Sequence, residues 1–223
     1  MHARLVHDNW RVTMKRKQKQ AGPSDADIKR LLERYACPVP FHAVRTRFLG
    51  ALAAPEMTPP MQIVAGLWGG ELPVFDSTEE ANELLTALVM GLWNRLSQHQ
   101  QRKNPFHLKR LRQPQDVRRL AAHAQVRVEE LRGFMDGLFG DQESVELPER
   151  AHEALQHLSK LHSFMAAYVQ FSDDPDLDLP ETQRRLIELT RIAETEINAF
   201  VLSCVRARRH QLQTQSAKPP LLH

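Results

Sequence analysis

The histidines and acids of the chain are the first residues to consider for chemistry, because imidazole and carboxylate groups bind metal ions. The 223 residues include eleven histidines, and His152 is followed by Glu153, as at the start of a zinc-protease motif. The next histidine, His157, comes five residues after His152, which places the two rings about 140° apart around a helix. A ferritin-like di-iron site needs two Glu-x-x-His motifs, and only Glu149 to His152 has that spacing. The sequence therefore predicts no metal site, and we expect these histidines on the polar side of a surface helix.

Nucleophilic and cofactor chemistry also lack their motifs. The chain contains no Gly-x-Ser-x-Gly, and its only cysteines, Cys37 and Cys204, lie in no recognisable catalytic context. Gly66, Gly69 and Gly70 lack the Lys-Ser/Thr of a phosphate-binding loop and the preceding strand of a dinucleotide fold, so we interpret them as helix termination. We predict a protein that is not an enzyme and needs no cofactor. Two cysteines are too few for a disulfide framework, which favours a reducing cytoplasm.

A basic segment at residues 102–119 is the strongest candidate for nucleic-acid binding. It combines seven Lys or Arg residues with a single acid and with Phe106. Basic side chains contact phosphates, and an interleaved aromatic ring can stack on a base. No helix-turn-helix or other known nucleic-acid module accompanies the segment, so a solvated connector between two helices is the competing interpretation. The candidate contacts are Arg102, Lys103, Lys109, Arg110, Arg112, Arg118 and Arg119.

Charge is distributed unevenly along the chain. The formal net charge is only +3, but residues 1–22 carry six Lys or Arg against one acid, and residues 205–223 carry four basic residues and no acid. We expect a basic, disordered N-terminal segment at 1–22, a domain at 23–212 and a C-terminal tail at 213–223. Basic tails attract phosphate backbones or dock on acidic faces, while solvated tails are the simpler interpretation.

Apolar periodicity predicts helices throughout the domain. Apolar residues recur every three or four positions, as at Leu84, Leu88 and Leu92, and no segment alternates with period two. We therefore expect an all-α fold, a single bundle of six to seven helices. The longest apolar stretches, such as residues 84–93, are far shorter than the roughly 20 residues that cross a bilayer, so we exclude a membrane protein. The expected helices span about residues 24–37, 41–54, 60–68, 77–102, 115–138, 148–171 and 180–204.

Two stretches combine bulky apolar residues with glycine or alanine, a composition that lets two helix backbones approach closely. They are RFLGALAAP at residues 47–55 and GFMDGLFG at residues 133–140. The second stretch has two glycines four residues apart inside one predicted helix. Because glycine costs a helix about 0.5–1 kcal/mol relative to alanine, we expect either a close crossing or a local break there. The structural positions of the two stretches are Phe48, Leu49, Leu52, Pro55, Gly133, Phe134 and Gly137.

These stretches, together with LWGG at residues 67–70, DSTEEANELL at 76–85 and MGLWNRL at 90–96, resemble the uncharacterised bacterial family that includes YecA and YgfB. The resemblance implies an all-helical, dimeric domain with no established enzymatic role. Some relatives end in a Cys- and His-rich zinc module of the kind attached to the SecA translocase. This chain has no such tail, so neither zinc nor a translocase partner is expected.

We expect a cytoplasmic protein that binds another macromolecule. The leading hypothesis is a non-enzymatic interaction or regulatory adaptor that forms a homodimer and binds a protein partner, whose identity the sequence does not indicate. An apolar corner at Leu67, Trp68 and Phe75 is the first candidate for the partner surface, although the same side chains suit a core. The alternative is a nucleic-acid-associated protein that uses segment 102–119 and the basic tails.

Overall fold

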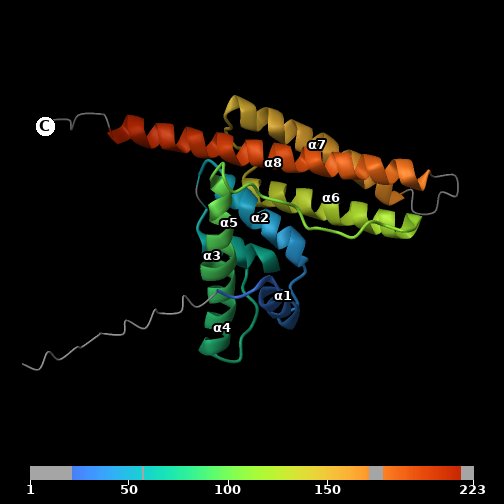
Figure 1. Ribbon diagram of the computed structural model, residues 1–223. Coiled ribbons are helices and arrows are strands. Elements are labelled where there is room, and N and C mark those ends of the chain that lie inside the picture. The colour runs from blue at the N-terminus through green and yellow to red at the C-terminus, as the bar shows by residue number, and fades with distance from the viewer. Residues whose placement is uncertain (1–21, 57, 171–177, 217–223) are drawn as a thin grey trace, which may run out of the picture.

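The structure is a computed structural model that describes residues 22–56, 58–170 and 178–216. All regular elements in these ranges are helical, which confirms the predicted all-α fold. Residues 1–21 and 217–223 of the predicted tails lie outside the described residues. The helices, labelled as in Figure 1, are α1 (Asp25–Arg34), α2 (Phe41–Ala53), α3 (Pro60–Ala65), α4 (Thr78–Leu85), α5 (Asn94–Ser97), α6 (Val117–Phe139), α7 (Glu149–Gln170) and α8 (Leu179–Ser216).

Side-chain caps and a glycine set the helix boundaries that the sequence indicates. At the start of α1, Ser24 accepts a hydrogen bond from the Asp27 amide, and the Asp27 carboxylate accepts one from the Ser24 N–H. Ser77 caps α4 and Asp116 caps α6, each with one side-chain bond. A short 3-10 turn, η1 (Gly66–Trp68), follows α3 and ends at Gly69, whose φ of +85° is the left-handed conformation that glycine adopts without strain. The interpretation of this glycine as helix termination is confirmed.

A close crossing of α2 and α6 is the most extensive helix contact of the described fold. A Cβ atom added to Gly137 would lie 1.8 Å from the carbonyl oxygen of Arg47. One added to Gly133 would lie 2.5 Å from the carbonyl oxygen of Ala43, and one added to Gly50 on α2 would collide with the α6 backbone. Helix α6 continues through both of its glycines. The predicted close crossing is therefore confirmed, and the alternative of a local break is wrong.

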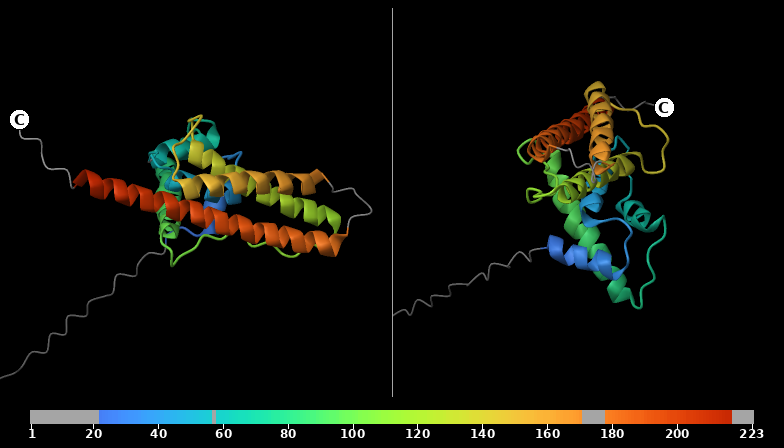
Figure 2. Two further views of the ribbon diagram at one scale, coloured as in Figure 1. Left: turned by 90° about the horizontal axis from the view of Figure 1, so that it is seen from above. Right: turned by 90° about the vertical axis from the view of Figure 1, so that its right-hand side faces the viewer.

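The long helices α6, α7 and α8 run alongside one another, and helices α1 to α5 lie on one side of them (Figure 1). Helix α8 continues to Ser216, past the domain end expected at residue 212, so the first part of the predicted C-terminal tail is helical. The last turns of α8 extend beyond α6 and α7 (Figure 2). The basic side chains of Arg206 and Arg209 are therefore presented on a helix.

The helix expected at 77–102 is continuous to Gln100, but it changes its winding. Between α4 and α5 lies a π-helical stretch, η2 (Thr86–Trp93), and a 3-10 turn, η3 (Gln98–Gln100), follows α5. A Cβ atom on Gly91 would lie 2.7 Å from the ring of Pro23, and Arg95 donates to the Pro23 carbonyl. Pro23, which precedes α1, is thereby held against Gly91 of η2 and Arg95 of α5. The sequence pattern does not predict this contact.

The core forms around the α2–α6 crossing. Phe48, Leu49, Leu52 and Phe134, all predicted structural residues, are buried there, and Pro55 is half-buried. Within the described ranges, no helix combines the length and apolar character that crossing a membrane requires.

Candidate nucleic-acid interface

The predicted basic segment contains a non-helical connection, residues 101–116, which we call the strap. The strap leads from η3 to the start of α6 and runs along α6 (Figure 1). Its side chains Phe106, Leu108 and Pro114 are buried and hold it to the body. The expected stacking of Phe106 on a base is wrong, because this ring is 0% exposed. It contacts the His99 ring edge-on, and the Arg45 guanidinium lies 5.1 Å from its centroid.

Two side chains of α8 bind the backbone of the strap. Asn198 accepts a hydrogen bond from the Phe106 N–H at 2.8 Å and donates one to the Phe106 carbonyl at 2.9 Å. Glu194 accepts the Leu108 N–H at 2.9 Å, and its second carboxylate oxygen lies 3.1 Å from Nδ1 of His107. Peptide groups that lack regular secondary structure are thus paired by side chains, which fixes this part of the strap on α8.

A buried ion pair on α6 fixes the middle of the strap. Glu130 accepts the Lys109 N–H at 2.7 Å, and Arg127 donates to the Lys109 carbonyl at 2.8 Å. The two side chains also pair with each other inside the protein. Burial raises the pKa of Glu130, and the Arg127 charge and the Lys109 amide offset part of this shift. Sequence reasoning missed the pair, although both residues lie in helical register with Phe134 on the apolar side of the predicted helix.

All seven predicted cationic contacts are exposed. Arg119 pairs with Asp116 at 3.5 Å and donates to Gln115. The other six make no ion pair and no side-chain hydrogen bond with any residue that the structure describes. They follow one another along the strap and into the first turn of α6, and we call these six unpaired cations the row. The six are Arg102, Lys103, Lys109, Arg110, Arg112 and Arg118.

Two cavities flank the centre of this row. A cavity of about 350 Å³ lies between the strap, α6 and α8, and a cavity of about 570 Å³ lies between the strap, α1 and α2. Lys109 and Arg110 line both. The carboxylates of Asp25 and Glu33 line only the larger cavity. Lys109 and Arg110 can therefore be reached from both cavities. The smaller cavity has fewer carboxylates among its described lining residues than the larger one.

The apolar corner predicted as a partner surface is occupied by contacts within the protein. Leu67 is 1% exposed and belongs to the core. The Trp68 indole donates to the Tyr35 carbonyl at 2.8 Å, and the Phe75 ring packs edge-on against the Tyr35 ring at 5.1 Å. Leu67 is therefore not available as a partner surface, whereas Trp68 and Phe75 are half-buried and contact Tyr35, the residue that follows α1. The neighbouring Val74 is 93% exposed.

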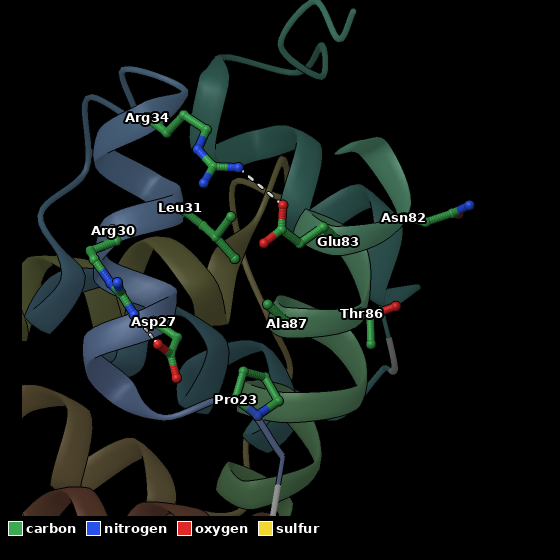
Figure 3. A pocket seen from close by; sticks show the side chains of 9 residues that line it. All are labelled: Pro23, Asp27, Arg30, Leu31, Arg34, Asn82, Glu83, Thr86 and Ala87. Atoms are coloured by element: carbon green, nitrogen blue, oxygen red, sulfur yellow. Dashed lines mark hydrogen bonds and ion pairs between the residues drawn. The ribbon is translucent and has the colours of Figure 1, made fainter. Parts of the chain in front are cut away.

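A further cavity, of about 560 Å³, lies between α1 and α4 (Figure 3). Its charged side chains pair with one another: Asp27 accepts from Arg30, and Arg34 donates to Glu83 at 3.0 Å. The first ion pair lies within α1, and the second joins α1 to α4. The cavity therefore offers fewer unpaired charges than the strap does, and its groups are explained by helix packing.

Metal and thiol chemistry receive no support from the described residues. They contain no group of three or more His, Cys, Asp or Glu side chains that could hold a metal ion. His157 lies 3.1 Å from Glu196 on α8, whereas His152 contacts Gln156 on its own helix, so the two rings diverge as their spacing predicts. Burial raises the pKa of Cys204 to about 11, which keeps this thiol protonated at neutral pH.

Comparison of the chain with protein-family models, with curated proteins and with solved structures finds no match. Membership of the family that includes YecA and YgfB therefore stays a prediction from the sequence.

Proposed function

We propose that this protein is a non-enzymatic nucleic-acid-binding protein that contacts phosphates through the strap. The observation that carries the proposal is the row of six exposed Lys and Arg side chains, to which the described residues supply no acidic partner. Such cations bind phosphates without first breaking an internal ion pair, and they release counterions from the nucleic acid.

The anchored backbone of the strap supports the same proposal. Side chains of α6 and α8 hydrogen-bond to Phe106, Leu108 and Lys109. Binding then requires ordering of the cationic side chains alone, at about 0.5–1.5 kcal/mol each. A solvated connector would also lose backbone entropy, about 1–2 kcal/mol for each residue that becomes fixed. The strap therefore presents its charges at a lower entropic cost than the connector that the competing sequence interpretation describes.

The expected contacts are with phosphates along the row. Phe106 is buried, so no exposed aromatic ring lies between the cations, and the strap is not a helix that could enter a DNA groove. Binding should then depend steeply on salt. For a single strand, the slope of log K against log salt concentration grows by about 0.7 for each phosphate contacted.

The adaptor hypothesis has less support, since Leu67, Trp68 and Phe75 already contact their own chain. An acidic protein is nevertheless a chemically reasonable occupant of the same cations, and the experiment must separate it from nucleic acid. As part of the proposal we place the protein in the cytoplasm, because Cys37 and Cys204 are free thiols.

The test is a pair of double variants that remove equal charge. Arg112→Gln with Arg118→Gln removes two unpaired cations at the α6 end of the row. The control, Arg132→Gln with Lys160→Gln, removes two exposed cations from α6 and α7 outside the strap. Fluorescence anisotropy with a labelled oligonucleotide, between about 50 and 200 mM salt, should show a slope about 1.4 smaller for the strap variant. The control should keep the slope of the unmodified protein.

Equal losses in the two double variants would contradict the strap as the binding site, because net charge alone would then explain the affinity. A protein that stays bound from a nuclease-treated lysate, combined with no oligonucleotide binding at the lowest salt, would replace this proposal by the adaptor.

A further inference from the structure

The smaller cavity beside the strap has an apolar wall. Its volume of about 350 Å³ lies at the lower end of the range of about 300–1,000 Å³ that small-molecule sites span. The strap contributes Leu108 and Leu111, and α8 contributes Leu186 and Ile187. Leu108 and Leu186 are buried, Leu111 is half-buried, and Ile187 is 37% exposed. The cavity thus combines a largely buried apolar wall with one partly exposed apolar side chain, Ile187.

Cations surround this wall. Lys109, Arg110 and Arg191 line the cavity and are exposed. None of the three makes an ion pair with a residue that the structure describes. They are therefore available to an anionic group that enters from solvent, with which they can form charge-assisted hydrogen bonds.

The other charged groups of the cavity are already engaged. Of the described residues that line it, Glu194 alone is a carboxylate, and both of its oxygens are occupied, one by the Leu108 N–H and one near His107. Arg127 is held by Glu130, by the Lys109 carbonyl and by the Thr190 hydroxyl. An incoming anion consequently meets three unpaired positive charges and a carboxylate whose charge is partly compensated.

One further wall residue is a histidine without a polar contact. Nε2 of His123 is buried and has no hydrogen-bond partner in the described residues. Burial and the nearby Arg127 charge lower the pKa of His123, so its ring is neutral at neutral pH. A neutral imidazole offers one donor and one acceptor, and the hydrogen-bonding capacity of the buried Nε2 is unused among the described residues.

We propose that this cavity binds one unpaired nucleotide of a single strand, with the base against Leu111 and Ile187 and its phosphate at Lys109, Arg110 and Arg191. The inference rests on the proposed nucleic-acid binding and specifies the kind of nucleic acid. A base inside a duplex is stacked and paired, so entering a side pocket requires a strand whose bases can be splayed out. Two carboxylates line the larger cavity, Asp25 and Glu33, which pair with Arg95 and Lys29, whereas Glu194 is the one carboxylate among the described residues that line the smaller cavity.

Two isoleucines on α8 provide a matched test. Ile187 and Ile192 are 37% and 40% exposed, but only Ile187 lines the cavity. Anisotropy with a single-stranded oligonucleotide and with a duplex of the same length, at one salt concentration, should show tighter binding of the single strand. Ile187→Gln should weaken single-strand binding about fivefold and leave duplex binding unchanged. Ile192→Gln should bind both as the unmodified protein does.

A second measurement uses the unmodified chain, so it does not depend on how a variant folds. Photo-crosslinking of a single strand that carries a halogenated uracil, followed by peptide mass spectrometry, should locate the base on residues 108–114 or 183–194. Crosslinks confined to other peptides would overturn the nucleotide pocket, as would equal affinity for duplex and single strand. Either result leaves the strap proposal standing if the Arg112 and Arg118 double variant still reduces the salt slope. Failure of all oligonucleotides to bind at low salt would instead refute the proposed function itself.

Discussion

Replacing Gly137 by alanine should destabilise this protein, although the same change stabilises most helices. In an ordinary helix, alanine is favoured over glycine by about 0.5–1 kcal/mol because the unfolded glycine chain has more freedom to lose. At position 137 the added Cβ would lie 1.8 Å from the carbonyl oxygen of Arg47 and 2.9 Å from its Cα. These obstacles are backbone atoms of α2, which cannot rotate away as the end of a side chain can.

The size of the effect follows from the movement that the new methyl group demands. Real Cβ contacts are not closer than 3.0 Å, so the backbones of α2 and α6 must separate locally by about 1 Å. A gap of about 0.5–1 Å forfeits a quarter to a half of each dispersion contact across the interface. Overpacking of a core costs about 1–3 kcal/mol and occasionally more. We expect a net loss of about 3 kcal/mol for Gly137→Ala, because the clash is with backbone.

Urea denaturation followed by circular dichroism measures this loss directly, and the melting temperature should fall by about 6–12 °C. Gly66→Ala is the matched control. Gly66 has a helical φ of −59°, and the nearest atom to its added Cβ is the flexible end of Arg47 at 3.1 Å. The control should change the free energy of unfolding by no more than about 0.5 kcal/mol. A Gly137→Ala variant as stable as the unmodified protein would refute the inferred close approach of the two helices.

Three further predictions concern buried polar groups. Glu130→Gln should lower the free energy of unfolding by about 3–5 kcal/mol, because it leaves a buried arginine without its counter-charge; a urea midpoint that does not change would contradict this. Burial lowers the pKa of His123 and His162 below the ordinary value of 6.5, so the unfolded chain binds more protons and stability should fall as pH drops below about 6.5. Urea midpoints measured across that range should flatten when both histidines are replaced by Gln. In the native protein a thiol reagent should modify the half-buried Cys37 before the buried Cys204, whose pKa is raised to about 11, and faster labelling of Cys204 would contradict the burial.

Local signals accounted for most of the fold. Caps at Ser24 and Ser77 and the glycine stop at Gly69 act within a few residues of their helix ends, so they can be read without knowing the tertiary structure. The same holds for apolar periodicity, which located every long helix to within a few residues except the end of α8. Composition left open whether Gly133 and Gly137 allow a close crossing or break their helix, and the structure shows the crossing with α2.

The candidate site depended on contacts between residues distant in the chain. Phe106 lies among basic residues in the sequence, as a ring that stacks on a base would, yet its ring is buried. Leu67 belonged to an apolar corner that was proposed as a partner surface, yet this side chain is buried in the core, and Trp68 of the same corner donates to the carbonyl of Tyr35. Burial of a given apolar residue depends on what covers it, and periodicity describes only the face of its own helix.

The sequence by itself determined the helices, their caps, the absence of known catalytic motifs and the seven cations of segment 102–119. Only the tertiary structure decided that the connection within this segment is an anchored strap. That property arises from the pairing of Lys109 with Arg127 and Glu130 and from the bonds to Asn198 on α8. Hydrogen bonds between residues some twenty to ninety positions apart leave no periodic trace in a sequence, because they depend on how completed helices pack against one another.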